Sequence, residues 1–236
     1  MKEYITMPKL MRFNVLFLLL LLNTGVKIFR GEQTAHVNPS SREKKLALTF
    51  DDGPSSAPLA RIFAILEQEK VKATFFVVGN RVGLFPQQTA EYMKRGHTIA
   101  NHTYSHQNYY QLRKSKTEDE FNAIVRREIA KGAQAIKNIA GVRPVYLRMP
   151  NGFVSSDVRK IAAETGHTIV NWSFGCDWKK LPKEKMIQNY LASIQPGAIL
   201  LFHEKEITAD VLPDIIAGIK KKGYKIVTLE EILSSR

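Results

Sequence analysis

The chain of 236 residues, 44% of them apolar, is long enough for one domain with a sizeable core, which excludes global disorder. Its net charge of +13 suits an acidic partner, such as an anionic wall polymer or a nucleic acid. Many of the basic residues lie on expected helices, within residues 126–131 and 220–222, where a solvated helix face is the ordinary interpretation. No nucleic-acid-binding signature accompanies them, so we predict no nucleic-acid partner.

Residues 1–30 have the pattern of an export signal. Lys2, Lys9 and Arg12 precede the apolar run of residues 15–22. The run is too short to span a bilayer comfortably, but no small-x-small cleavage site follows it, so an uncleaved membrane anchor stays open. We expect a signal peptide or membrane anchor over 1–30, a polar linker over 31–45, and one domain over 46–236. The domain is then exported: periplasmic, at the cell surface or secreted.

From Leu46 onward, apolar strand-like segments alternate with helix-like segments. The expected strands are Leu46–Phe50, Ala73–Val78, Thr98–Ala100, Pro144–Leu147, Thr168–Trp172, Ala198–Phe202 and Lys225–Val227. The expected helices are Leu59–Gln68, Gln87–Arg95, Thr117–Ile139, Ser156–Thr165, Lys183–Ser193 and Ala209–Lys222. About seven such repeats predict an α/β fold, with a parallel sheet covered by helices.

Several polar residues fall at or just after the carboxyl ends of the expected strands. They are Asp51, His102, Arg148, Asp177 and His203. In a barrel these strand ends converge on one face, where catalytic groups gather. A distorted or partly open (β/α) barrel therefore explains the pattern better than a flat, doubly wound sheet.

Asp51 and Asp52 give two adjacent carboxylates at the end of the first strand. Because neighbouring residues on a strand point in opposite directions, we expect separate roles, one as a metal ligand and the other facing the substrate. The alternative is a helix N-cap before Gly53 and Pro54.

His102 and His106 are four residues apart, so their imidazoles would share one side of a helical turn. The alternative is a pair of surface histidines. Together with one of the aspartates they predict a divalent metal site of two histidines and one carboxylate, and hence metal-assisted hydrolysis.

His203 ends an apolar strand, and the charged residues after it predict a solvent-facing rim, where a histidine can act as a general acid. His97 and His167 precede strands and are expected at the opposite end, as structural residues. The single cysteine, Cys176, excludes an intrachain disulfide. We expect it to be a small apolar residue that lines the site rather than a nucleophile.

Five segments in order resemble the motifs of the NodB-homology polysaccharide deacetylases, carbohydrate esterase family 4. They are Thr49–Gly53, Ala73–Val77, Asn101–His106, Arg148–Pro150 and Leu201–His203, within a resemblance that covers about residues 46–233. The resemblance implies a distorted (β/α) barrel that hydrolyses N- or O-acetyl groups on polysaccharides. It also implies a divalent metal, usually Zn²⁺, with Co²⁺ or another divalent ion as alternatives.

The resemblance also implies roles for individual residues. The metal ligands would be Asp52, His102 and His106. Asp51 would be the general base, held ionised by Arg148, and His203 the general acid, supported by Asp177. The substrate would be bound by Trp178, which walls the acetyl pocket, together with Pro150, Asn151 and Leu201.

The sequence departs from the family pattern at two positions. Asn151 stands where an aromatic residue usually follows the proline, and Phe174 stands where a second acid usually precedes the Asp-Trp pair. The stretch from Trp172 to Trp178 is also one residue short. These changes affect substrate preference and the surroundings of Arg148 and His203.

Peptidoglycan is the preferred substrate, because an export signal and a basic surface suit an anionic wall. Chitin oligosaccharides, poly-GlcNAc and acetylated xylan stay open. The alternative function is a catalytically weak carbohydrate-binding protein that keeps the fold. A nucleic-acid binder has only the charge in its favour.

Overall fold

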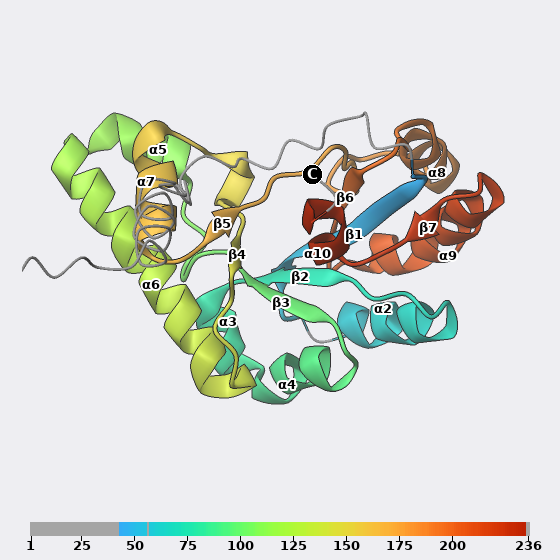
Figure 1. Cartoon of the computed structure of the whole chain (residues 1–236), viewed down its shortest axis with the longest axis horizontal. Coiled ribbons are helices and arrows are strands. Elements are labelled where there is room, and N and C mark those ends of the chain that lie inside the picture. Colours follow the sequence, from blue (N-terminus) through green and yellow to red (C-terminus); the bar gives the residue numbers. More distant parts are fainter. Residues whose placement is uncertain (1–42, 56, 235–236) are drawn as a thin grey trace, which may run out of the picture. The chain divides into compact units, whose positions relative to one another are not determined.

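The computed structural model describes residues 43–55 and 57–234 (Figure 1). The expected export signal and nearly all of the expected linker lie outside these residues. Among the described helices, none is both long and apolar enough to cross a lipid bilayer.

Strands and helices alternate along the described part of the chain. The strands are β1 (Lys45–Gly53), β2 (Thr74–Val77), β3 (Thr98–Asn101), β4 (Tyr146–Leu147), β5 (Thr168–Ile169), β6 (Ala198–His203) and β7 (Lys225–Ile226). The α-helices are α2 (Ala57–Gln68), α3 (Gly79–Leu84), α4 (Pro86–Lys94), α5 (Tyr109–Ser115), α6 (Glu118–Ala140), α7 (Ser156–Glu164), α8 (Lys183–Ala192), α9 (Glu206–Lys221) and α10 (Leu229–Ser234). A 3-10 turn, η2, spans Pro150–Gly152.

The seven strands form one parallel sheet with the order β5-β4-β3-β2-β1-β6, and β7 pairs with the start of β1. The sheet curls into a half-barrel with helices packed around it (Figure 1). The predicted α/β fold, a single domain with a partly open (β/α) barrel, is confirmed.

The central strands are buried on both faces, as in parallel sheets covered by helices. Residues 46–50 of β1 are fully buried. Phe50 stacks on Phe75 of β2 at 4.8 Å and on Phe202 of β6 at 5.5 Å between ring centroids. Because close-packed aromatic rings fix β1 between its neighbours, the residues that follow them at the strand ends are held in place.

The ends of the central strands are also aligned in register. Asp51 of β1 pairs with His203 of β6, and Val77 of β2 pairs with Asn101 of β3. Residues far apart in the sequence are therefore brought to one level of the sheet.

The sequence located the long elements well and several short ones poorly. In α6 the side chain of Thr117 and that of Glu120 form a capping box, and Gly141 ends the helix with a φ of 73°. The short helices α3, α5 and α10 were not predicted, because six or seven residues are too few to show a helical period. The predicted strand Thr168–Trp172 ends at Ile169, and β1 continues three residues past its predicted end at Phe50.

Candidate active site

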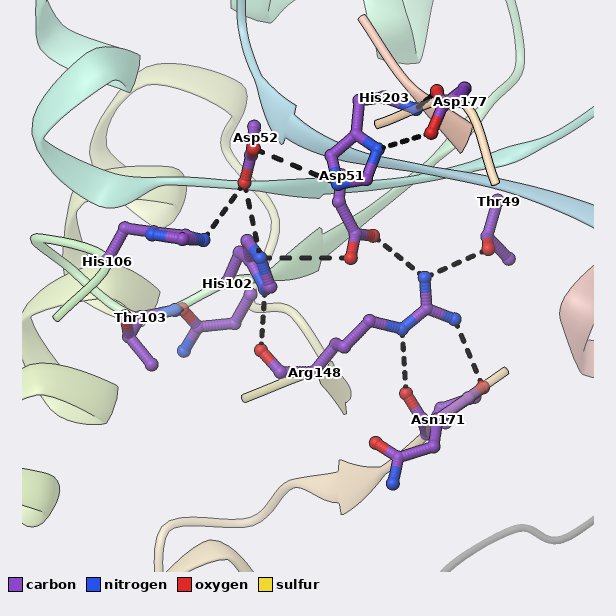
Figure 2. Close-up of polar contacts among 12 residues, drawn as sticks. Thr49, Asp51, Asp52, His102, Thr103, His106, Arg148, Asn171, Asp177 and His203 are labelled. Atoms are coloured by element: carbon purple, nitrogen blue, oxygen red, sulfur yellow. Dashed lines mark hydrogen bonds and ion pairs between the residues drawn. The ribbon is translucent and has the colours of Figure 1, made fainter. Parts of the chain in front are cut away.

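Asp51 and Asp52 lie inside β1, and a bulge brings both carboxylates to one site. The register of β1 against β2 shifts between Asp51 and Gly53, and Asp52 has a φ of 68°. As a result, Asp51 Oδ2 and Asp52 Oδ1 lie 3.7 Å and 3.4 Å from the same atom, His102 Nε2 (Figure 2). The expectation that the two side chains point in opposite directions is wrong here, because a bulge interrupts the alternation of a strand. Among the hydrogen bonds of the described residues, none joins either carboxylate to a backbone N–H of a helix.

The segment that carries the two histidines is an irregular loop after β3, and not the helical turn that their spacing predicted. Thr103 and His106 have positive φ values of 64° and 53°. The loop nevertheless brings the two imidazole rings to 4.9 Å, and His106 Nε2 lies 3.0 Å from Asp52 Oδ1. The two histidines lie side by side as expected, while the local conformation that joins them differs from the prediction.

Backbone and side-chain contacts hold this loop in place. The amides of Gly79 and Asn80 in α3 donate to the carbonyls of Thr103 and Tyr104 at 2.9 Å and 2.8 Å. From α6, the Glu128 carboxylate accepts from the backbone N–H and the hydroxyl of Ser105, both at 2.8 Å. The local sequence gave no signal for Glu128, which is buried 23 residues away from Ser105.

Asp52, His102 and His106 form a donor set that fits a divalent cation. One carboxylate oxygen and two ring nitrogens lie within 4.8 Å of one another. His102 Nδ1 lies 2.7 Å from the carbonyl oxygen of Arg148, and since a carbonyl only accepts, Nδ1 carries the proton. In the neutral ring, the lone pair of Nε2 therefore faces Asp52. Such a set of two imidazoles and a carboxylate suits Zn²⁺.

The charges of this group favour an ionised Asp52. Burial raises the pKa of the Asp52 carboxyl, but the contacts with His102 and His106 outweigh it and hold the pKa well below its ordinary value. The same contact with Asp52 raises the pKa of His106. These directions apply to the site without an ion, and a bound cation would replace the imidazolium proton as the partner of the carboxylate.

Arg148, just after β4, is fully buried and holds Asp51. Its Nη1 donates to Asp51 Oδ1 at 2.7 Å and to the Thr49 hydroxyl at 2.9 Å (Figure 2). Its Nε and Nη2 donate to the carbonyls of Val170 and Asn171 at 2.9 Å and 3.1 Å. Arg148 thus occupies one oxygen of Asp51 and leaves the other directed at His102.

His203, at the end of β6, is oriented by Asp177. Asp177 Oδ1 lies 2.8 Å from His203 Nδ1, while Oδ2 accepts from the His203 backbone N–H at 2.6 Å and from the Thr208 hydroxyl at 2.7 Å. His203 Nε2 consequently faces the site, 3.9 Å from Asp52 Oδ2. Burial lowers the pKa of His203, but the hydrogen bond to Asp177 and the negative charges of Asp177, Asp51 and Asp52 together outweigh it and raise the pKa above its ordinary value.

The surroundings of His203 differ from the predicted exposed rim. Only 14% of its side chain is exposed, and the next residue, Glu204, is buried against Tyr92. Burial raises the pKa of Glu204 to about 7. The sequence suggested an exposed charged segment there because three charged residues in a row usually lie in solvent.

The predicted substrate-binding residues occupy different surroundings. Trp178 is 45% exposed, and its ring meets the His203 ring edge-on at 5.5 Å. Pro150 and Leu201 are buried, whereas Asn151 is exposed in η2 with a φ of 55°. Within the described residues, no polar side-chain contact connects Asn151 with Asp52, His102 or His106.

Phe174 and Cys176, near Asp177, belong to the core. Phe174 packs edge-on against Tyr190 at 5.3 Å. Cys176 is buried among apolar residues, and burial raises the pKa of its thiol to about 11, so the thiol stays protonated at neutral pH. A protonated, buried thiol agrees with a packing role rather than with a nucleophile.

His97 and His167 are also buried, and burial lowers the pKa of each to about 4. His97 accepts a hydrogen bond from the Ala73 N–H and stacks on Phe63 at 5.4 Å. Both side chains are neutral at pH 7 and fill the structure, as predicted for residues that precede strands.

Comparisons with known proteins identify the family of the chain. The family model for polysaccharide deacetylase matches residues 38–170. A peptidoglycan-N-acetylglucosamine deacetylase of Bacillus cereus is 34% identical over 81% of this chain and 69% of its own length. A solved peptidoglycan N-acetylglucosamine deacetylase is 34% identical, with a TM-score of 0.73 over 81% of this chain and 88% of that one. A CE4 family pseudoenzyme from Bacillus anthracis is 28% identical, with a TM-score of 0.74 over 81% of this chain and 66% of that one. The chain therefore belongs to the polysaccharide deacetylases of carbohydrate esterase family 4, hydrolases that act on amide bonds.

Proposed function

We propose that this protein is a metal-dependent deacetylase that removes N-acetyl groups from GlcNAc or MurNAc residues of a polysaccharide outside the cytoplasm. The observation that carries the proposal is the meeting of two differently held aspartates at one histidine. Asp51 is tied to Arg148, Asp52 faces two imidazoles, and both lie within 4 Å of His102. One carboxylate is thus suited to bind a cation and the other to accept a proton.

Asp52, His102 and His106 would hold the metal, with Zn²⁺ as the first choice. When bound there, a divalent cation supplies a Lewis acid that polarises the acetyl carbonyl and lowers the pKa of a water molecule. The residues around the ligands orient them, since His102 is fixed through its Nδ1 and Asp52 by the bulge in β1.

Asp51 and His203 would move the protons. Asp51 Oδ2 accepts a proton from the attacking water, and Arg148 keeps Asp51 in place. His203 donates its Nε2 proton to the departing amine nitrogen, while Asp177 holds the ring through Nδ1. The products are acetate and the free amino sugar, and the water supplies the second acetate oxygen.

Peptidoglycan is the proposed substrate. Two of the similar proteins are named peptidoglycan deacetylases, and the net charge of +13 suits an anionic wall. Trp178, exposed beside His203, would wall the acetyl pocket, with Pro150, Asn151 and Leu201 as further substrate-binding residues. Residues 1–30 would direct export as a signal or membrane anchor, 31–45 would be a linker, and 46–236 the deacetylase domain.

The carbohydrate-binding alternative is not favoured. The full set of proposed ligands, base and acid is assembled, and both departures lie in the surroundings of the site: Phe174 packs against Tyr190, and Asn151 lies in an exposed turn.

The test is acetate release by the purified protein on peptidoglycan and on chitin oligomers, with and without Zn²⁺. We expect release from peptidoglycan that stops on chelation and returns with Zn²⁺. Acetate release from chitin oligomers alone would mean that a chitin-like polymer, and not peptidoglycan, is the substrate. Bound metal without release from either glycan would contradict the proposal and favour sugar binding without turnover.

A further inference from the structure

Glu204 is a buried carboxylate at the end of β6 that the proposed mechanism does not use. It is 7% exposed, and no basic side chain of the described residues lies within ion-pair distance of it. Its Oε2 accepts from the Ser55 backbone N–H at 2.6 Å, and its Oε1 accepts from the Tyr92 hydroxyl at 2.5 Å. These two bonds stabilise the carboxylate, but they offset its desolvation only in part, because burial still raises the pKa of Glu204 to about 7.

Both bonds meet at the turn that follows Asp52. The Glu204 carboxylate lies so close to Gly53 that a Cβ there would be 2.0 Å from Oε1 and 2.5 Å from the Tyr92 hydroxyl oxygen. On the other side, Arg81 Nε donates to the carbonyl of Pro54 at 3.1 Å. The turn is therefore held by β6, by α4 through Tyr92, and by α3 through Arg81.

Asp52 needs such support, because its backbone has a φ of 68°. Residues other than glycine rarely adopt this conformation, and it persists where the surrounding structure over-determines it. If the turn relaxed, the carboxylate would rotate away from His102 and His106.

We propose that Glu204 is a positioning residue for the metal site. It holds the turn at Gly53 and Ser55 and thereby keeps the Asp52 carboxylate directed at the two histidines. The inference rests on the proposed role of Asp52 as a metal ligand. Because Glu204 directly follows His203, it also joins the strand end of the proposed general acid to that of the proposed ligand.

The experiment measures metal affinity and does not depend on turnover. Dissociation constants for Zn²⁺ and Co²⁺, and the visible absorption of the Co²⁺ protein, are compared for the wild type, Glu204→Leu and Glu204→Gln. Leu fills the space but accepts no hydrogen bond, so we expect an affinity about 10- to 100-fold weaker and an altered Co²⁺ spectrum. Gln still accepts from Ser55, so it should recover most of the affinity.

Leu66→Ala is the control for lost stability. Leu66 is fully buried in α2, two residues before the end of the helix, and packs in the same apolar core as Tyr92. This variant should unfold at a lower temperature with unchanged metal affinity. Glu204→Leu binding within twofold of the wild type, or Leu66→Ala weakening the affinity as much, would overturn the inference.

A second pair of variants tests the contact itself. Gly53→Ala should weaken metal binding because its Cβ would displace the Glu204 carboxylate. In the Glu204→Ala background the same change should cost less, since the nearer of the two clashing oxygens is gone and only the Tyr92 hydroxyl has to give way. Fully additive effects would contradict the proposed contact.

Asp52→Ala separates this inference from the proposed function. Loss of metal in Asp52→Ala together with unchanged binding in Glu204→Leu refutes only the positioning role. Unchanged binding in Asp52→Ala refutes the ligand assignment itself.

Discussion

At the scale of single residues, the partners of each aspartate separate their roles. One oxygen of Asp51 accepts a hydrogen bond from Arg148, whose guanidinium is fully buried. Among the described residues, the ion-pair partners of Asp52 Oδ1 are the imidazoles of His102 and His106. The sequence singled out both carboxylates, but their difference arises from Arg148 and His106, which lie in the segments after β4 and β3.

Asp51→Asn tests the general base. The amide keeps the shape of the carboxylate but cannot take a proton, so we expect acetate release to fall at least about 100-fold. Zn²⁺ affinity should stay within a few-fold, since Asp51 is not a proposed ligand. Acetate assays and metal titration on one preparation measure both, and full activity would refute the assigned mechanism.

Asp177→Asn tests the general acid through its pH dependence. The hydrogen bond to Asp177 raises the pKa of His203 against the effect of burial. A general acid works only while protonated, so activity is lost as pH rises through this pKa. Without the negative charge the pKa falls, and the alkaline limb of kcat should move down by about one pH unit.

The charges near His203 define the control for that measurement. Asp51 and Asp52 also raise the pKa of His203 and are unchanged in the variant. Thr208→Val removes a hydroxyl that donates to Asp177 Oδ2, the oxygen that also accepts from the His203 backbone N–H, and it leaves the charge of Asp177 in place. If the alkaline limb of kcat moved equally in Asp177→Asn and Thr208→Val, the orientation of the Asp177 side chain, and not its charge, would set the pH dependence.

At the scale of secondary-structure elements, parallel strands bring the site together and irregular backbone shapes it. The bulge in β1, the loop after β3 and the turn η2 each contain a residue other than glycine with positive φ, at Asp52, at Thr103 and His106, and at Asn151. Propensity and periodicity describe regular segments, so the sequence predicted the strands before these irregular segments but not the conformations within them.

Asn151→Tyr tests the departure from the family pattern. Asparagine tolerates the left-handed conformation at a φ of 55°, whereas a bulky aromatic residue is strained there. We expect the free energy of unfolding to fall by about 1 kcal/mol. Denaturant unfolding of Asn151→Tyr beside Asn151→Gly, which relieves the backbone, measures the difference. Equal stability of the two variants would show that η2 adapts to the aromatic residue.

At the scale of the whole molecule, the site joins segments from residue 51 to residue 203 across one curled sheet. Metal binding should therefore stabilise the folded domain. At a free Zn²⁺ concentration of 100 times the dissociation constant, the expected gain is about 2.7 kcal/mol. Thermal unfolding with and without Zn²⁺ measures it. His106→Ala should remove the shift, whereas His97→Gln, which changes a buried histidine outside the ligand group, should keep it.

The sequence by itself determined the alternation of strands and helices, the partly open barrel and the identity of the clustered residues. It could do so because burial on both faces leaves continuous apolar strands, and the polar residues then mark the strand ends. Only the tertiary structure decided that a bulge directs two neighbouring aspartates at one histidine and that the histidine pair lies in a loop. It also decided that Glu204 is buried against the turn after Asp52. These features depend on contacts between residues far apart in the sequence, such as Ser55 with Glu204, which are 149 positions apart, and no local pattern in a sequence encodes contacts over such separations.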